Sequence, residues 1–389
     1  MVRAEAPGRD GDRRRPTFAR NAVARGPALD RLLAGLAARL EAAGYAERAT
    51  PDADTSVVLH AVDARAPRPF RRKAAPTFVV AVAQLDALPP DRDAQLRTGY
   101  PLLVRCLANL CLLVVDTPAG LAVRFVTLEQ GTFGAGPGLD DDALVAAVFD
   151  RLEPLASSRL VIANEFVADL PDHLRHGDAA TAQMLRAGRA LDALDLLPAP
   201  FPLEEILPPR DLRHVKLLYG IGGLSYGNLS ARCTGGDVTA VPEPGGPVFW
   251  MSASGVDKSE LRTIGRDILL VRGYDDRRDV MVLSVPPGIE PRRVSVDAIE
   301  HWMIYREHPG VGAIVHVHGW IDGTPSTEVN YPCGTVQLAT SVAELVRAAP
   351  NPTRAVVGLR NHGLTITGES LDEIFERVGA RIVPRVPMS

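Results

Sequence analysis

The 389-residue sequence lacks the features that mark membrane, secreted and nucleic-acid-binding proteins. No apolar run approaches the roughly 20 residues that a membrane-spanning helix needs, and the N-terminus has no apolar signal-peptide core. The formal net charge is only -4, which gives no global reason to expect a nucleic acid as a partner. We therefore expect a soluble, cytoplasmic protein with neither membrane nor nucleic acid as a partner.

Cysteine is also scarce. The four cysteines, Cys106, Cys111, Cys233 and Cys333, show no CxxC spacing and lie mostly in apolar surroundings. Metal sites and redox centres built from cysteine usually bring such pairs close together in the sequence. We expect four buried thiols outside any disulfide, and no cysteine among the metal ligands.

The length and the 46% hydrophobic content predict an ordinary globular protein with two domains. Residues 1–26 are rich in arginine and poor in large apolar residues, which predicts a disordered basic tail. Residues 198–211 are dense in proline, which disfavours regular helix and predicts a stiff linker. The expected organisation is therefore an N-terminal domain at 27–197 and a C-terminal domain at 212–389.

The N-terminal domain shows mixed periodicities typical of an α/β or α+β fold. Leucines at helical spacing from residue 29 to 40 predict a helix. The glycine-rich run at 131–138 has neither a P-loop lysine nor a dinucleotide fingerprint, so we interpret it as an ordinary loop. Strands are expected at 56–62, 77–85, 110–115 and 121–128, and further helices at 93–109, 140–155 and 181–194. No motif in this domain indicates a chemistry.

Two histidines stand on alternate residues at the end of an apolar run in the C-terminal domain. Residues i and i+2 of a strand project from one face, so the rings of His316 and His318 can point at one spot. His362 follows a second apolar run and is a candidate third ligand for a divalent metal. The alternative is that these are buried histidines that hydrogen-bond to the backbone.

Small, donor-rich segments surround these histidines in the sequence. Gly227 and Asn228 follow a glycine-rich stretch, and Ser254 and Gly255 form a second turn. Ser295 precedes an amphipathic segment at 296–307 and is a candidate N-cap, where a helix N-terminus favours an anion.

Asp297 lies in the first turn of that predicted helix, where it either carries chemistry or compensates the helix dipole. His301 follows one helical turn later. It is a candidate to orient Asp297 or to donate a proton, and a surface or core histidine is the alternative.

Five short motifs occur in a characteristic order: GNLSAR at 227–232, SASG at 252–255, SVD at 295–297, HVH at 316–318 and NHG at 361–363. Together they resemble the class II aldolase/adducin family, over roughly residues 212 to 382. The resemblance implies a nine-stranded antiparallel sheet layered with helices, assembled as a homo-oligomer, usually a tetramer.

The same resemblance assigns roles to individual residues. It implies that His316, His318 and His362 bind the metal and that Asp297 is the acid/base. Gly227, Asn228, Ser254, Gly255 and Ser295 match the positions that hold a substrate phosphate. Val296 replaces the second serine of the family pattern, and the loop at 319–331 is shorter than in the sugar-phosphate enzymes. A phosphorylated substrate is therefore less firmly implied than a small hydroxylated one.

The resemblance implies a metal-dependent lyase of the aldolase type, which breaks or forms a C–C bond next to a carbonyl through a metal-stabilised enediolate. Three imidazoles suit several divalent metals, and we expect zinc first and manganese second. The alternatives within the family are a sugar-phosphate 4-epimerase or a decarboxylase. The alternative outside catalysis is an adducin-like binding or assembly module.

Overall fold

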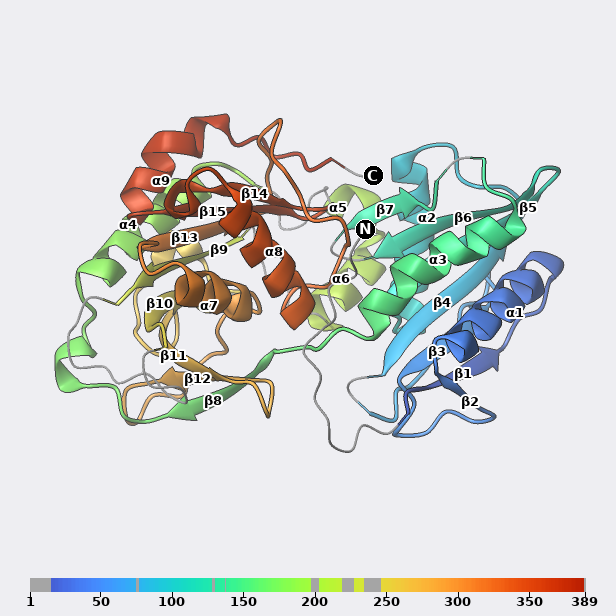
Figure 1. Cartoon of the computed structure of the whole chain (residues 1–389), viewed down its shortest axis with the longest axis horizontal. Helices are drawn as coiled ribbons and strands as arrows, with labels where there is room; N and C mark the ends of the chain where they lie inside the picture. The colour runs from blue at the N-terminus through green and yellow to red at the C-terminus, as the bar shows by residue number, and fades with distance from the viewer. Residues whose placement is uncertain are drawn as a thin grey trace.

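The computed structural model describes residues 15–74, 77–127, 130–136, 138–196, 203–218, 227–233 and 246–387. Two β-sheets, each covered by helices, lie side by side (Figure 1). The first sheet occupies the N-terminal part of the chain, and the second carries the histidine motifs.

The N-terminal sheet has seven strands in the order β2-β1-β3-β4-β5-β6-β7. The five from β2 to β5 run parallel, and β6 and β7 are antiparallel additions at one edge. Residues on both faces of β3 and β5 are buried, which explains their continuous apolar sequences. The strands are Thr17–Ala22 (β1), Ala46–Arg48 (β2), Val57–Val62 (β3), Phe78–Leu85 (β4), Leu110–Thr117 (β5), Gly120–Thr127 (β6) and Gly131–Gly134 (β7).

Helices cover both faces of this sheet. Helices α1 (Pro27–Ala42) and α3 (Asp141–Ala156) share one apolar core with it, and α2 (Arg92–Cys106) packs in a second core on the opposite face. The side chains of Asp91 and Asp140 accept hydrogen bonds from the first turns of α2 and α3, which fixes where these helices begin. Helix α2 is continuous despite the glycine and proline within it.

The C-terminal sheet has eight described strands in the order β14-β15-β13-β9-β10-β11-β12-β8. All neighbours are antiparallel except β8, which runs parallel to β12. The family pattern of nine antiparallel strands is thus modified in the described residues. The strands are Ala163–Val167 (β8), Gly227–Arg232 (β9), Phe249–Ser252 (β10), Ile268–Asp275 (β11), Val280–Ser284 (β12), Ala313–Val317 (β13), Val356–Leu359 (β14) and Gly363–Gly368 (β15).

Four helices complete this α/β domain. Helices α7 (Ala298–Glu307) and α8 (Val336–Ala348) pack together, whereas α4 (Ala179–Asp192) and α9 (Leu371–Val378) contact each other and the strands near β13 (Figure 1). One extended apolar core joins the sheet to these helices.

Three predictions about organisation are wrong in part. Strand β1 lies inside the segment 1–26 that we predicted to be disordered, because its residues pair with β2 and β3. Strand β8 and helix α4 belong to the C-terminal sheet and core, although the predicted N-terminal domain extended to residue 197. The glycine-rich run at 131–138 begins as strand β7 and not as a loop.

The predicted linker also contains regular structure. Helices α5 (Leu203–Ile206) and α6 (Pro209–Leu218) pack near α2, with Ile206 and Leu207 buried in the core on that face. Prolines at the first positions of a helix are tolerated because those N–H groups have no intrahelical partner. Asp211 of α6 is fully buried and accepts two hydrogen bonds from Arg105, at 2.8 and 3.3 Å.

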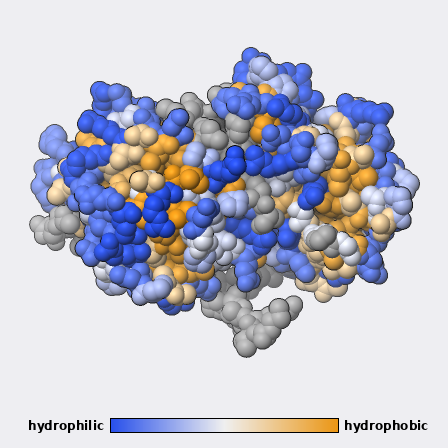
Figure 2. Space-filling model, turned by 90° about the horizontal axis from the view of Figure 1, so that it is seen from above, coloured by the Kyte–Doolittle hydropathy of each residue, from blue (hydrophilic) through white to orange (hydrophobic). Residues whose placement is uncertain are grey.

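Among the described helices, none is long and apolar enough to cross a membrane. Seen from above, the surface is mostly hydrophilic, with apolar residues gathered in separate patches on the two halves (Figure 2).

Candidate metal centre

The strand β13 positions His316 at the middle of the C-terminal sheet. Its residues pair with β9 on one side and β15 on the other, so that His316 lies opposite Asn228 and Thr365. His316 is 1% exposed, and His318, just beyond the strand end, is half-buried. The predicted arrangement of the two rings on one face is therefore present.

His362 reaches the same spot from the connection between β14 and β15. Asn361, with φ of +60°, turns the chain so that His362 faces β13. The Nε2 atoms of His316 and His362 are 3.2 Å apart, and the ligand atoms of all three histidines lie within 4.8 Å of one another. Burial, and then the neighbouring rings, lower the pKa of His316 well below its usual value. The imidazole is thus kept neutral, which is the form that binds metal.

This donor set fits a divalent cation. The nitrogens of three imidazoles lie within 4.8 Å of one another, and three histidine nitrogens are a ligand set that suits divalent metals. Gly227 makes the approach of β9 possible: its φ is +145°, and a Cβ there would lie 2.1 Å from the backbone oxygen of His316. The packing of β9 against β13 therefore requires glycine at position 227, independently of the predicted role of Gly227 in substrate binding.

Asp297 lies directly before helix α7 and is 5% exposed. Its Oδ2 accepts a hydrogen bond from Nδ2 of Asn228 at 2.7 Å and faces Oγ of Ser295 at 3.5 Å. Burial raises its pKa to about 6, and hydrogen bonds from Asn228, Cys333 and Ser295 oppose the rise. The structure thus brings three of the predicted residues together around one buried carboxyl group.

The prediction that Ser295 caps this helix is wrong. Helix α7 begins at Ala298 with Asp297 in the N-cap position, and the Asp297 side chain makes no capping hydrogen bond. Its Oδ2 accepts a hydrogen bond from the buried Asn228 amide instead, at 2.7 Å. Dipole compensation alone does not explain this orientation.

His301 lies deeper in the core. It is fully buried, its Nδ1 shares a hydrogen bond with Oγ of Ser230 at 2.7 Å, and Ser230 also contacts the hydroxyl of Tyr305 at 2.9 Å. Burial lowers the pKa of His301 to about 3, so the ring is neutral. These contacts favour a role in positioning over direct proton transfer.

Ser254 and Gly255 form a half-buried turn after β10. The backbone N–H of Ser254 donates to the oxygen of Arg293 at 2.9 Å, and Ala253 forms a β-bridge with Val294. This pairing brings the turn beside the segment that leads to Ser295. Residues 219–226 of the neighbouring glycine-rich motif lie outside the described residues.

Two residues that sequence reasoning missed also belong to this region. Glu300 is 1% exposed and accepts a hydrogen bond from Oγ1 of Thr365 at 2.5 Å. Burial, and then the charge of Asp297, raise the pKa of Glu300 to about 8. Glu300 follows Asp297 by three residues on one predicted helix, and this spacing indicates in the sequence that the two side chains lie on the same face.

Cys333 is the second residue. Its Sγ lies 3.3 Å from Nε2 of His362. The prediction of four buried thiols holds for Cys106 and Cys111, but Cys233 and Cys333 are half-buried. No disulfide joins the four cysteines.

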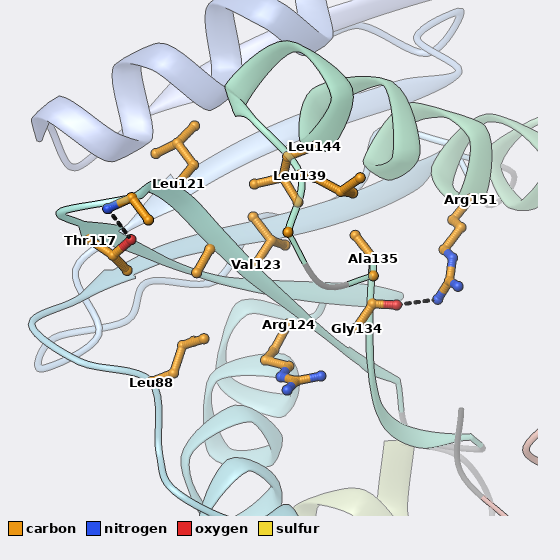
Figure 3. A pocket seen from close by; sticks show the side chains of 14 residues that line it. Leu88, Thr117, Leu121, Val123, Arg124, Gly134, Ala135, Leu139, Leu144 and Arg151 are labelled. Atoms are coloured by element: carbon orange, nitrogen blue, oxygen red, sulfur yellow. Dashed lines mark hydrogen bonds between the residues drawn. The ribbon is translucent and has the colours of Figure 1, made fainter.

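A cavity of about 530 Å³ lies in the other domain, away from the histidines. Leu121, Val123, Leu139 and Leu144 gather along it, and Arg151 points toward the carbonyl of Gly134, to which it donates a hydrogen bond (Figure 3). The cavity is therefore largely apolar, with cationic groups at its margin.

Comparison with known proteins identifies the C-terminal region. Residues 213–320 match the family model described as Class II Aldolase and Adducin N-terminal domain. A search of curated proteins finds no match.

Solved structures with some similarity include an L-fuculose 1-phosphate aldolase, which is 17% identical, with a TM-score of 0.34, over 52% of this chain and 82% of that one. YgbL of Klebsiella pneumoniae, titled as a candidate aldolase/epimerase/decarboxylase, is 19% identical, with a TM-score of 0.31, over 52% and 86%. An aldolase II superfamily protein of Pseudomonas syringae is 16% identical, with a TM-score of 0.31, over 51% and 71%. The family match over residues 213–320 agrees with the resemblance seen in the sequence motifs of the C-terminal region.

Proposed function

We propose that the C-terminal domain is a metal-dependent lyase of the aldolase type, which cleaves or forms a C–C bond next to a carbonyl in a small hydroxylated substrate. One observation carries the proposal: the ligand atoms of three histidines lie within 4.8 Å of one another, in the same domain as a buried carboxyl group whose described hydrogen bonds include no cationic partner. Ionisable groups are rarely buried in this way unless they serve a site.

In this proposal His316, His318 and His362 hold the divalent cation, which supplies Lewis-acid stabilisation of negative charge on substrate oxygens. Asp297 takes a proton from the substrate carbon or returns it. A pKa of about 6 suits both directions near neutral pH, because neither protonation state is strongly favoured. Asn228 and Ser295 hold its Oδ2 in place.

The same residues would serve an epimerase or a decarboxylase, so these remain the alternatives within the enzyme class. The non-catalytic adducin-like module is less well supported. A module that only binds a partner gains nothing from a buried Asp297 and Glu300, whose charged forms are disfavoured by burial.

Elemental analysis of the purified full-length protein tests the proposal. We expect about one zinc per chain, with manganese as the second candidate, and no bound metal in a His316→Ala, His362→Ala double variant. A His173→Ala, His176→Ala variant is the matched control, because both histidines are exposed and should not affect metal content. Absence of metal in the parent after incubation with divalent ions would sink the proposal.

A metal-loaded parent is then screened for aldol cleavage of hydroxylated acids and sugar phosphates, with epimerisation and decarboxylation measured in parallel. The homo-oligomer, usually a tetramer, that the resemblance implies stays a prediction, and light scattering after size-exclusion chromatography measures it directly.

A further inference from the structure

The thiol of Cys333 lies beside His362, one of the three converging histidines. Its Sγ is 3.3 Å from Nε2 of His362, and that nitrogen is 3.2 Å from Nε2 of His316. Zinc bonds of about 2.0–2.1 Å to nitrogen and 2.3 Å to sulfur place tetrahedral ligands about 3.4 Å (N to N) and 3.6 Å (N to S) apart. The two separations in the chain are within a few tenths of an ångström of these edges.

A second observation points to the same place. The Cys333 thiol also hydrogen-bonds with the carboxyl group of Asp297, which is 5% exposed and whose Oδ2 accepts a hydrogen bond from Asn228. Cys333 therefore contacts both His362 and the carboxyl group of Asp297.

The backbone holds this thiol in position. Gly334 has φ of +76°, and a Cβ there would meet Ile162 at 3.0 Å and the Val296 oxygen at 3.2 Å, so the turn after Cys333 requires glycine. The oxygen of Gly334 accepts a hydrogen bond from the N–H of Val161 at 2.7 Å. Thr335 then caps helix α8. A ligand fixed in this way loses little entropy when it binds.

We propose that Cys333 is the fourth protein ligand, so that the resting site consists of three histidine nitrogens and one thiolate. The inference rests on the proposed function, because it requires a cation at the three histidines. On binding, the thiol releases its proton to solvent and the metal–sulfur bond forms, with no change in oxidation state. A thiolate favours zinc or cobalt over manganese, which narrows the choice of metal.

Cobalt(II) titration of the metal-free full-length protein tests the ligand set without measuring turnover. We expect visible bands of tetrahedral cobalt together with an intense near-ultraviolet thiolate-to-cobalt charge-transfer band. Cys333→Ser should lose the near-ultraviolet band, whereas Cys233→Ser, which alters the other half-buried cysteine, should keep it. X-ray absorption of the zinc-loaded parent should show one sulfur neighbour at about 2.3 Å.

The outcomes separate the two proposals. If the parent binds no cobalt and no zinc, the proposed function itself fails. If cobalt binds but parent and Cys333→Ser give the same near-ultraviolet spectrum, the three-histidine site stands and the role of Cys333 is refuted. Should Cys333→Ser fail to fold, the absorption measurement on the parent alone decides, since a shell without sulfur overturns the inference.

Discussion

The two sheets of this protein bury very different side chains. Within the described residues, the N-terminal sheet and its three covering helices bury one ionisable side chain besides cysteine and tyrosine, His60, whose ring bonds to Asn21 and to the Arg68 oxygen. Of its described residues, the C-terminal domain buries six with ionisable side chains: Lys258, Asp297, Glu300, His301, His316 and His362.

We interpret this difference as one between residues that build the fold and residues of the proposed site. An apolar core stabilises the protein directly, whereas a buried ionisable group costs stability unless it is paired. The core of the N-terminal sheet is apolar almost throughout. The C-terminal domain departs from this pattern at Lys258 and, above all, around the three histidines and Asp297. We therefore expect changes in the two domains to have opposite consequences for stability and activity.

The largest effect is expected from Asp297→Asn. The substitution keeps the shape and removes proton transfer, so activity should fall by about 10²–10⁴-fold. Metal content should not change, and the free energy of unfolding should stay the same or rise, because a buried carboxyl group is removed. Steady-state kinetics and metal analysis measure both. Full activity in the variant would show that another group moves the proton.

A truncation of a core side chain in the N-terminal sheet should lower stability and leave the metal site unchanged. Leu112 is fully buried in β5, and Leu112→Ala should lower the free energy of unfolding of that domain by about 2–5 kcal/mol. The three tryptophans, Trp250, Trp302 and Trp320, all lie in the C-terminal domain, so their fluorescence reports that domain alone.

In the Leu112→Ala variant, the unfolding transition followed by circular dichroism should shift to a lower denaturant concentration. The transition followed by tryptophan fluorescence and the metal content should stay unchanged. Leu269→Ala, the same change in strand β11 of the C-terminal sheet, is the matched control and should shift the fluorescence transition. Equal shifts of both signals in both variants would show that the two domains unfold as one unit.

Glu300 makes the stability of the metal-free protein depend on pH. Its pKa is about 8 in the folded protein, above its ordinary value of 4.5, so the folded state binds this proton more tightly than the unfolded chain does. The stabilisation is complete below about pH 4.5 and is lost as the pH rises through about 8, by on the order of a few kcal/mol.

Glu300→Gln keeps an acceptor for Thr365 and removes the titration, so its unfolding free energy should change much less across that range. Glu369→Gln, at an exposed position, is the control and should follow the parent. Parallel curves for the parent and Glu300→Gln, measured by denaturant titration at several pH values, would exclude Glu300 as the source.

The smallest effect concerns Asp211, a buried charge that is paired. Arg105→Ala removes two hydrogen bonds from a fully buried carboxylate and should destabilise the protein by about 1–3 kcal/mol. Arg65→Ala, whose partner Asp86 is 98% exposed, should change stability by less than about 0.5 kcal/mol. An equally small effect for Arg105 would show that water reaches Asp211 readily.

The sequence predicts much of the site because its signals are local. The alternation of His316 and His318 on an apolar strand, and the position of His362 after a second one, require only strand geometry and pairing. Strands β3 to β6 and helices α1 to α3 were likewise predicted from periodicity. Their boundaries differ from the predictions by at most three residues.

What the sequence does not reveal depends on pairing between distant segments. Strand β8 joins β12 across more than 100 residues, and no local pattern states which sheet an apolar strand will enter. Cys333 lies in an irregular segment with no spacing relationship to the histidines, so only the fold brings its sulfur to His362. The position of Glu300 near Asp297, in contrast, could have been predicted from helical periodicity.

The segment that follows helix α3 pairs with the residues directly after Cys333. Arg159 and Val161 exchange backbone hydrogen bonds with Val336 and Gly334, and Leu160 forms a β-bridge with Thr335. A fragment of the protein cut at the predicted boundary near residue 198 would lose this support together with β8 and α4. Any dissection of the two domains must therefore cut before Arg159, which leaves those residues with the C-terminal domain.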